Sequence, residues 1–445
     1  MRKTLRQRFH LEPPAGLLND PNGLAWYRGV YHVYFQWNKF EKNHSYKEWG
    51  SFASDDLVHW QFQGSALVPD QPYDQNGVYS GSALEIDGKL CLYYTGNVKH
   101  QGLRNSRQCL AVTEDGRRYL KLGPVLEKPD GYTPHFRDPK VFRGENGWYY
   151  MLIGAQQASG RGALALARSR DGLVWDQPHP LAFSQNYEMI ECPDLFSLDG
   201  QAVLLYCPQA RNNDTDTCLS SYSAYKPVTF NEETGTLSPA DADLDQGLIL
   251  TDGGFDFYSP QTFVDGKGRR LLFAWMSRME EAEEQAFAAG EPSVHCLTMP
   301  RVLHWREGRL WQTPPEELYS LLGEPIRPSE LSDRTFWLDI RPTAGDQPFH
   351  LTFHGGEAAL EFDPAARTLT FTRTGWLTGR PESKTCPLDH LDRLEIWSDS
   401  SSLELFVNGG STVFSSRIYP TSETLGLDVR GVDGCGITLR PIRTI

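Results

Sequence analysis

Three carboxylates in this sequence have neighbours that could support chemistry, and the first is Asp20. It lies in Asn19-Asp20-Pro21-Asn22-Gly23, a run typical of a tight turn because Pro presets φ and Gly accepts positive φ. Leu17 and Leu18 precede the run, and a strand is expected to begin at Leu24. The sequence therefore predicts a carboxylate held rigidly beside buried apolar groups, a placement that suits a nucleophile. In an isolated Asn-Asp-Pro, the Asp carboxylate more often only accepts hydrogen bonds from the backbone of its own turn.

The second carboxylate is Asp138, in Phe136-Arg137-Asp138-Pro139-Lys140. The adjacent Arg137 can hold the acid ionised, and its guanidinium offers a fork of donors to hydroxyl groups. An Arg-Asp dipeptide taken alone is most often a surface ion pair. Here a strand is expected to begin at Lys140, so Asp138 shares the predicted strand-start position of Asp20.

The third carboxylate is Glu191, in the stretch from Met189 to Phe196, with Met, Ile, Cys and Pro close to it. Apolar surroundings disfavour the ionised form and raise the pKa of a carboxyl, which a general acid working near neutral pH requires. An exposed Glu on a strand edge is an equally common explanation. The sequence alone therefore makes Glu191 a candidate acid.

The three motifs, in this order and at these separations, resemble the signature of glycoside hydrolase family 32, the invertase and fructan-hydrolase family. The resemblance covers essentially the whole chain. It implies that Asp20 is the nucleophile, that Glu191 is the acid/base and that Asp138 binds two sugar hydroxyls and stabilises the transition state.

The resemblance also implies a fructose pocket. The residues expected to line it are Asn19, Gln36, Trp49, Tyr79, Ser80, Arg137, Cys192, Tyr258 and Trp275. The family usually has Trp-Met before Asn-Asp, where this chain has Leu17-Leu18, and this affects one aromatic wall of the pocket but not the carboxylate. At Tyr79 the family more often has Phe.

Composition limits the partners. The chain has 445 residues, enough for two or three domains, and its formal net charge of −14 argues against nucleic acid and anionic membranes. The 8 Cys show no Cys-x-x-Cys spacing, so no metal site is expected, and two carboxyls with water need no cofactor. The N-terminus lacks an apolar signal region, and no apolar run approaches the ~18 residues of a membrane span. These features predict a cytoplasmic protein that binds a small sugar, as a monomer or homodimer.

An internal repeat organises the first part of the chain. Residues 54–60, Ser-Asp-Asp-Leu-Val-His-Trp, recur in altered form at 113–119 and at 169–175. Each copy places an Asp turn between two strands, and such a period in a strand-rich chain is typical of a propeller with one four-stranded blade per repeat. Each repeated Asp is expected to form a turn rather than to act as a catalyst.

The pattern changes after a segment rich in Pro and Glu. We expect an all-β fold in which residues 1–318 form a five-bladed propeller, 319–332 a linker and 333–445 a β-sandwich. In the last part, Asn408-Gly409 predicts a two-residue hairpin turn. The acidic, Ala-rich stretch from Glu280 to Ala289 is expected to be a short helix or a loop insertion.

These features together predict a retaining β-fructofuranosidase that acts on sucrose or sucrose 6-phosphate. A non-catalytic sugar-binding propeller stays open as an alternative, as do exo-fructanase and fructosyltransferase activities on the same scaffold; an inverting glycosidase fits the motifs less well. A phosphorylated substrate would need a positive patch, and the loop from Lys39 to Lys47, with Lys42 and His44, is one candidate. A solvated charged loop is the commoner explanation of such a run.

Overall fold

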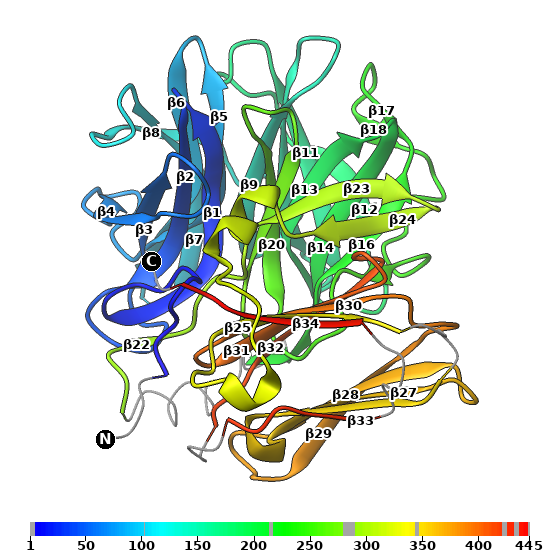
Figure 1. The fold of residues 1–445 in the computed structure, drawn as a ribbon. Coiled ribbons are helices and arrows are strands. Elements are labelled where there is room, and N and C mark those ends of the chain that lie inside the picture. The colour runs from blue at the N-terminus through cyan, green and yellow to red at the C-terminus, as the bar shows by residue number, and fades with distance from the viewer. Residues whose placement is uncertain are drawn as a thin grey trace. The chain divides into compact units, whose positions relative to one another are not determined.

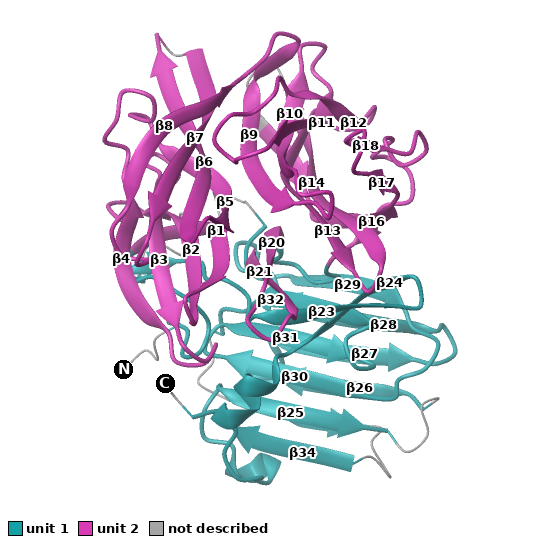
Figure 2. Ribbon diagram, turned by 90° about the horizontal axis from the view of Figure 1, so that it is seen from above, with its two compact units in different colours: residues 1–15, 252–257, 276–445 teal, residues 16–251, 258–275 magenta. Residues whose placement is uncertain are grey.

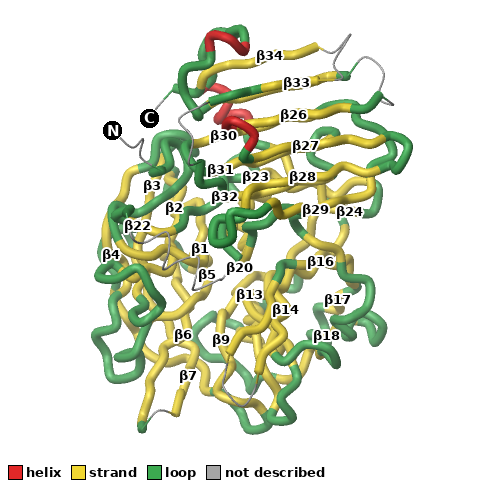
Figure 3. Tube along the Cα trace, turned by 90° about the horizontal axis from the view of Figure 1, so that it is seen from below, coloured by secondary structure: helices red, strands yellow, loops and turns green. Residues whose placement is uncertain are grey.

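The computed structural model describes residues 5–101, 103–212, 217–278, 290–342, 347–420, 425–430 and 436–443. Its regular structure is almost entirely β-strand, as Figure 3 shows. The chain forms two compact units, distinguished in Figure 2. The larger unit contains residues 16–251 and 258–275, and the smaller unit contains residues 1–15, 252–257 and 276–445. The helix or insertion expected at Glu280–Ala289 lies outside the described residues.

Antiparallel sheets of consecutive strands build the larger unit (Figure 1). The first blade is β1 (Gly16–Tyr27), β2 (Val30–Asn38), β3 (Glu48–Ser54) and β4 (Gln61–Leu67). The second is β5 (Val78–Ile86), β6 (Lys89–His100), β7 (Leu103–Thr113) and β8 (Leu120–Glu127). The third is β9 (Tyr132–Arg143), β10 (Tyr149–Gln157), β11 (Gly162–Ser169) and β12 (His179–Phe183). The fourth is β13 (Met189–Leu198), β14 (Gln201–Asn212), β15 (Thr217–Ser221), β16 (Ala224–Val228) and β19 (Ile249–Leu250). The fifth begins with β20 (Tyr258–Val264) and β21 (Arg270–Trp275). Between β16 and β19, β17 (Phe230–Asn231) pairs with β18 (Thr236–Leu237).

The first strands of the five blades form a closed ring. Strand β1 contacts β5, β5 contacts β9, β9 contacts β13, β13 contacts β20, and β20 returns to β1. Buried apolar side chains fill the space between neighbouring blades, for example Leu92 and Ala25 between the first two. The prediction of an all-β, five-bladed propeller is therefore confirmed.

The repeated turns confirm the role expected for their Asp residues. The Oδ1 atoms of Asp56, Asp115 and Asp171 each accept hydrogen bonds from the backbone N–H groups two and three residues later, at 2.8–2.9 Å. A carboxylate used in this way closes a turn between two strands. These three acids are therefore structural.

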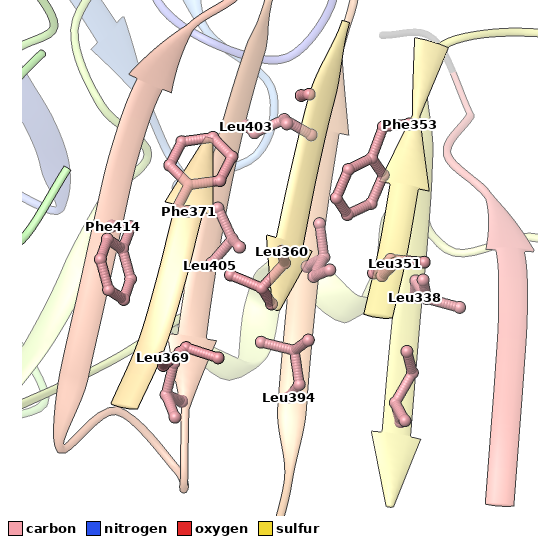
Figure 4. Close-up of a cluster of buried hydrophobic side chains, with 14 of the residues drawn as sticks. Leu338, Leu351, Phe353, Leu360, Leu369, Phe371, Leu394, Leu403, Leu405 and Phe414 are labelled. Carbon is pink, nitrogen blue, oxygen red and sulfur yellow. The ribbon is translucent and has the colours of Figure 1, made fainter. Parts of the chain in front are cut away.

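A β-sandwich dominates the smaller unit. One sheet has the order β32-β31-β30-β25-β34, and the other has the order β29-β28-β27-β26-β33. Their bounds are β25 (Phe336–Arg341), β26 (Phe349–Phe353), β27 (Ala358–Asp363), β28 (Thr368–Thr374), β29 (Pro381–Pro387), β30 (Leu394–Asp399), β31 (Ser402–Val407), β32 (Thr412–Arg417), β33 (Asp428–Arg430) and β34 (Gly436–Pro441). Alternate residues point inward and pack between the sheets, among them Leu360, Phe371 and Leu405 (Figure 4).

The smaller unit also contains short elements outside the sandwich. They are β22 (Ser293–Val294), the hairpin β23 (Arg301–Arg306) and β24 (Arg309–Thr313), and the 3₁₀ helices η1 (Glu316–Leu321), η2 (Pro328–Glu330) and η3 (His354–Gly356). The segment expected to be a linker, 319–332, thus includes the end of η1 and all of η2. The domain boundaries at 318 and 333 stay a prediction.

Three local predictions were wrong, and one is the strand start expected at Lys140, because β9 begins at Tyr132 and Asp138 lies inside it. The connection between β31 and β32 has four residues rather than two, because Val407 pairs with Thr412. The run Asn19–Gly23 is not a turn before a strand, because it lies inside β1. Pro and Gly mark a distortion of that strand instead.

Candidate active site

Every inner strand of the propeller carries a β-bulge at an equivalent place. The strand pairing slips by a residue or more at each of these points. The tripeptides at the bulges are Asn19-Asp20-Pro21, Tyr79-Ser80-Gly81, Arg137-Asp138-Pro139, Glu191-Cys192-Pro193 and Tyr258-Ser259-Pro260. A bulge takes a residue out of the ladder and bends the strand, and Pro is tolerated there because no ladder N–H is lost. This device turns the predicted site residues away from the regular sheet.

Three bulge residues have left-handed backbone conformations. The φ angles of Asp138, Cys192 and Ser259 are 63°, 46° and 51°. A non-glycine residue in this region costs roughly 1–3 kcal/mol, and such conformations cluster at functional sites. The strain falls at matching positions in three blades, at Asp138 and at the residues that follow Glu191 and Tyr258.

Asp20 lies on β1 and is partly accessible to solvent. The Ser80 hydroxyl on β5 donates to Oδ2 of Asp20 at 2.5 Å. Burial raises the pKa of the Asp20 carboxyl, the Ser80 hydrogen bond opposes this, and the negative charge of Glu191 adds to the rise. The Lys47 ammonium donates to Oδ1 of Asn19 at 2.5 Å, and its charge lowers the pKa of Asp20.

Asp138 lies on β9 and is only 4% exposed. Its backbone N–H donates to Oγ1 of Thr95 at 3.0 Å, and its Oδ2 accepts from the backbone N–H of Cys192 at 3.2 Å. Burial raises the pKa of the Asp138 carboxyl to about 7; Arg137 opposes this rise, while the charges of Glu191 and Asp20 add to it.

Glu191 lies on β13 and is partly accessible. Its Oε1 accepts from Arg137 Nε at 3.0 Å and from Nη2 of the same guanidinium, and its Oε2 accepts from the Tyr258 hydroxyl at 2.8 Å and from the Gln209 amide. The expectation that apolar surroundings raise its pKa was wrong. Burial does raise the pKa of Glu191, but Arg137 and Tyr258 outweigh burial and leave the pKa below its ordinary value.

The three acids therefore form one electrostatic cluster, in which Asp138 and Glu191 share Arg137 and the charge of Asp20 acts on Asp138. The Arg137 guanidinium contacts Glu191 directly, and its Nε lies 3.9 Å from Oδ2 of Asp138. Burial of these three carboxylates near one another favours uptake of a proton near neutral pH, and such a proton belongs to the cluster rather than to one residue. The raised pKa of Asp138 and the lowered pKa of Glu191 bias this shared proton toward Asp138.

The remaining predicted pocket residues lie near this cluster. Some of them do not face the site and instead support the backbone of β5. The Gln36 amide donates to the carbonyl of Val78 at 2.7 Å, and the Trp49 indole donates to the carbonyl of Tyr79 at 3.0 Å. Trp49 has no exposed surface, so its ring supports the strand of Tyr79 from behind. On the fifth blade, the rings of Tyr258 and Trp275 meet edge to face at 6.3 Å.

Leu17 and Leu18, which stand where the family usually has Trp-Met, have no exposed surface. They contribute to the core and offer no surface to a sugar.

Sequence reasoning missed several residues that contact the cluster. Gln209 on β14 donates to Glu191 and to the Tyr258 hydroxyl, and Thr95 on β6 holds the backbone of Asp138. The Nδ1 atom of His135 lies 2.7 Å from Nη1 of Arg137. His135 is next to the Phe136–Lys140 motif, but nothing local distinguishes Gln209 or Thr95, because their contacts come from other strands.

Comparison with known proteins agrees with this geometry. Residues 10–314 match the model of the glycosyl hydrolases family 32 N-terminal domain, and residues 320–436 match the model of its C-terminal domain. The chain is therefore a glycoside hydrolase and belongs to family 32.

Named relatives and solved structures are similar over nearly the whole chain. Sucrose-6-phosphate hydrolase of Bacillus subtilis (strain 168) is 38% identical over 437 residues, which cover 93% of this chain and 89% of the relative. The enzyme of the same name from Klebsiella pneumoniae is 39% identical over 93% of this chain and 88% of its own. The structure of sucrose-6-phosphate hydrolase from Lactobacillus gasseri is similar with a TM-score of 0.87 at 27% identity, covering 99% of this chain and 93% of that one. A family 32 β-fructofuranosidase from Bombyx mori gives 0.83 at 26% identity, with 99% and 94% covered.

Proposed function

We propose that this protein is a retaining β-fructofuranosidase that cleaves sucrose 6-phosphate, and sucrose less efficiently, to release fructose. The observation that carries the proposal is the placement of Asp20 and Glu191, two partly accessible acids, on inner strands where their charges act on one another. Relatives at 38–39% identity are named sucrose-6-phosphate hydrolases, and a mutant of the Bombyx mori enzyme was crystallised in complex with sucrose.

In the first step, a carboxylate oxygen of Asp20 attacks C2 of the fructosyl unit and forms a covalent ester. The bond between C2 and the glycosidic oxygen breaks, and that oxygen takes a proton from Glu191. In the second step, Glu191 accepts a proton from water, the water oxygen bonds to C2, and Asp20 leaves as a carboxylate. Two inversions give net retention, and fructose is released.

Glu191 must carry a proton when the glycosidic bond breaks, whereas Arg137 and Tyr258 lower its pKa and favour the ionised form. Arg137 can change which of the two acids holds the proton, because its guanidinium contacts both Glu191 and Asp138. If Arg137 turns toward Asp138, Asp138 can hold its negative charge and Glu191 can take the proton. Asp138, once ionised, binds ring hydroxyls and favours the positively charged transition state.

The deciding experiment compares kcat/KM for sucrose and sucrose 6-phosphate with the purified protein. The proposal expects activity on both and a higher kcat/KM for the phosphorylated sugar. Absence of hydrolysis would favour a non-catalytic sugar-binding propeller. Faster release of fructose from inulin or levan than from sucrose would favour an exo-fructanase, and fructosyl products at high sucrose would favour a transferase.

We also propose a cytoplasmic location. Every cysteine that the structure describes is a free thiol, as expected for a reducing compartment. Cys435 lies outside the described residues. Within the described part of the chain, no helix has the length and apolar composition that a membrane crossing needs. Whether the protein is a monomer or a homodimer stays a prediction that light scattering can test.

A further inference from the structure

The phosphate of sucrose 6-phosphate belongs to the leaving group, and this limits where it can bind. Asp20 attacks C2 from the side opposite the departing oxygen, and Glu191 meets that oxygen. The departing glucosyl 6-phosphate therefore lies beyond Glu191, away from Asp20. Basic groups that extend outward from Glu191 are the candidates for binding its phosphate.

A chain of three basic side chains leads outward from Glu191. Arg137 binds Oε1 of Glu191, and its Nη1 lies 2.7 Å from Nδ1 of His135. The Nη1 atom of Arg104 lies 3.3 Å from the same Nδ1. Arg137 is buried, whereas His135 and Arg104 are half-buried and reachable by solvent. Because a guanidinium can only donate, Nδ1 of His135 is the acceptor, and the neutral ring then carries its proton on Nε2.

The positions of Arg104 and His135 are fixed by the sheets. Arg104, Ser106 and Gln108 alternate along β7 and share one face of the strand. Strand β7 contacts β9, and there the Ser106 hydroxyl donates to the carbonyls of Pro134 and Phe136 at 3.0 Å, while the Gln108 amide donates to that of Phe136 at 3.0 Å. These bonds hold the backbone on both sides of His135.

The same arginine reaches the predicted pocket wall. The Arg104 guanidinium carbon lies 5.8 Å from the ring centre of Tyr79, which lies on the inner strand β5 beside Ser80. Arg104 is thus bracketed by Tyr79 and His135, on the two blades that supply Ser80 and Asp138. It is held at the edge of the proposed sugar site rather than on a remote surface.

We propose that Arg104 and His135 form the binding site for the phosphate of the substrate's glucosyl unit. The inference rests on the proposed function, which supplies the phosphorylated substrate. The planar guanidinium of Arg104 can donate two parallel hydrogen bonds to phosphate oxygens, and Nε2–H of His135 can donate a third.

The Lys39–Lys47 loop, the candidate from sequence, is anchored beside the nucleophile strand and β5, where the carbonyl of Lys47 accepts from the backbone N–H of Val78 at 3.0 Å. Lys47 donates to Asn19, next to the nucleophile, and to Nδ1 of His44 at 2.7 Å. Lys39 pairs with Glu48 at 3.0 Å. The Lys47 ammonium therefore orients Asn19 and lowers the pKa of Asp20, whereas Arg137 binds Glu191, which meets the leaving group.

The test measures kcat/KM for sucrose 6-phosphate and for sucrose in the full-length protein and takes their ratio. The variants are Arg104→Gln, His135→Gln and the charge-retaining Arg104→Lys. The matched control is Arg118→Gln, which removes the same charge in the turn between β7 and β8, where the side chain is 95% exposed. A folding defect lowers both rates and cancels in the ratio.

We expect Arg104→Gln to lower the ratio about 10- to 100-fold, as loss of a hydrogen bond to a charged group would. Arg104→Lys should restore part of the loss, His135→Gln should lower the ratio less, and Arg118→Gln should leave it unchanged. If the wild-type protein prefers sucrose 6-phosphate but neither Arg104→Gln nor His135→Gln changes the ratio, the subsite is wrong and the proposed function stands. If Lys47→Gln lowered this ratio while Arg104→Gln and His135→Gln did not, the phosphate would bind at the Lys39–Lys47 loop instead. If the wild-type ratio is near one, the choice of substrate fails, and this inference fails with it.

Discussion

Replacing Asp138 by Asn should abolish activity and yet make the protein more stable above neutral pH. Burial of the Asp138 carboxyl raises its pKa from an ordinary 3.8 to about 7. Between about pH 4 and pH 7 the folded protein therefore keeps a proton that the unfolded chain has lost. The free energy of unfolding of the wild-type protein falls as pH rises through this range. Asn does not titrate, so the free energy of unfolding of the variant does not decrease in this way.

The magnitude follows from the shift. Three pKa units correspond to about 4 kcal/mol at 1.36 kcal/mol per unit, and this is an upper limit. The larger unit has about 250 residues, for which an unfolding entropy of ~2.1 cal/mol/K per residue converts 4 kcal/mol into about 8 °C. A gain of several degrees in the Tm of Asp138→Asn over wild type, growing between about pH 4 and pH 7 and complete by about pH 8, is the expected result.

Thermal unfolding followed by circular dichroism at several pH values measures the gain. Asp115→Asn is the control, because the exposed Asp115 accepts backbone hydrogen bonds from Arg118 and Arg117 that lower its pKa. Its contribution to stability is present above the unfolded pKa and is lost only as pH falls through the folded pKa, so this variant should be less stable than wild type by a constant amount from pH 5 to pH 8. If the difference between Asp138→Asn and wild type is also constant over this range, Asp138 does not hold the buried proton.

Further predictions concern catalysis and the smaller unit. Asp20→Ala should abolish turnover and Glu191→Ala should lower kcat for sucrose about 10²- to 10⁴-fold; near-wild-type rates would remove the assigned roles. Early NMR spectra should show β-fructofuranose first, since the α-anomer would indicate a single displacement. In the smaller unit, His10 lies 2.9 Å from both Asp399 and Glu404; burial opposes its charge, but these partners raise its pKa to about 9. Its contribution to stability is full below pH 6.5 and lost as pH rises through 9, so His10→Gln should lower Tm at pH 6 and lose most of that deficit by pH 9.5.

Much of the fold could be predicted because its signals are local. The repeated Asp turns separate strands whose β-branched and aromatic residues are visible in the sequence, and the period gives the number of blades. The three acid motifs are also local runs of residues. The bulges were missed because Asn-Asp-Pro-Asn-Gly has the residue preferences of a turn, while the ladder on both sides keeps it inside β1.

The electrostatics of the site could not be predicted, because they depend on contacts between blades. The residues next to Glu191 in sequence are apolar, yet its carboxylate is surrounded by Arg137, Tyr258 and Gln209 from three other strands. Alternation explains the error, since neighbours along a strand point to opposite faces. The environment of a side chain on an inner strand is therefore set by neighbouring strands rather than by its own.

The ring of bulges explains how a repeated fold produces an asymmetric site. All five inner strands make the same distortion, so the central bulge residues lie at equivalent positions. Each central side chain can then act on the neighbouring blade: the Ser80 hydroxyl donates to Asp20, Cys192 Sγ lies 3.6 Å from Oδ2 of Asp138, and the Ser259 hydroxyl donates to that same sulfur. Each of these two acids is thus contacted by a small polar side chain from the next blade. Because the side chains at these equivalent positions differ, a repeated scaffold can hold acids with different proton affinities.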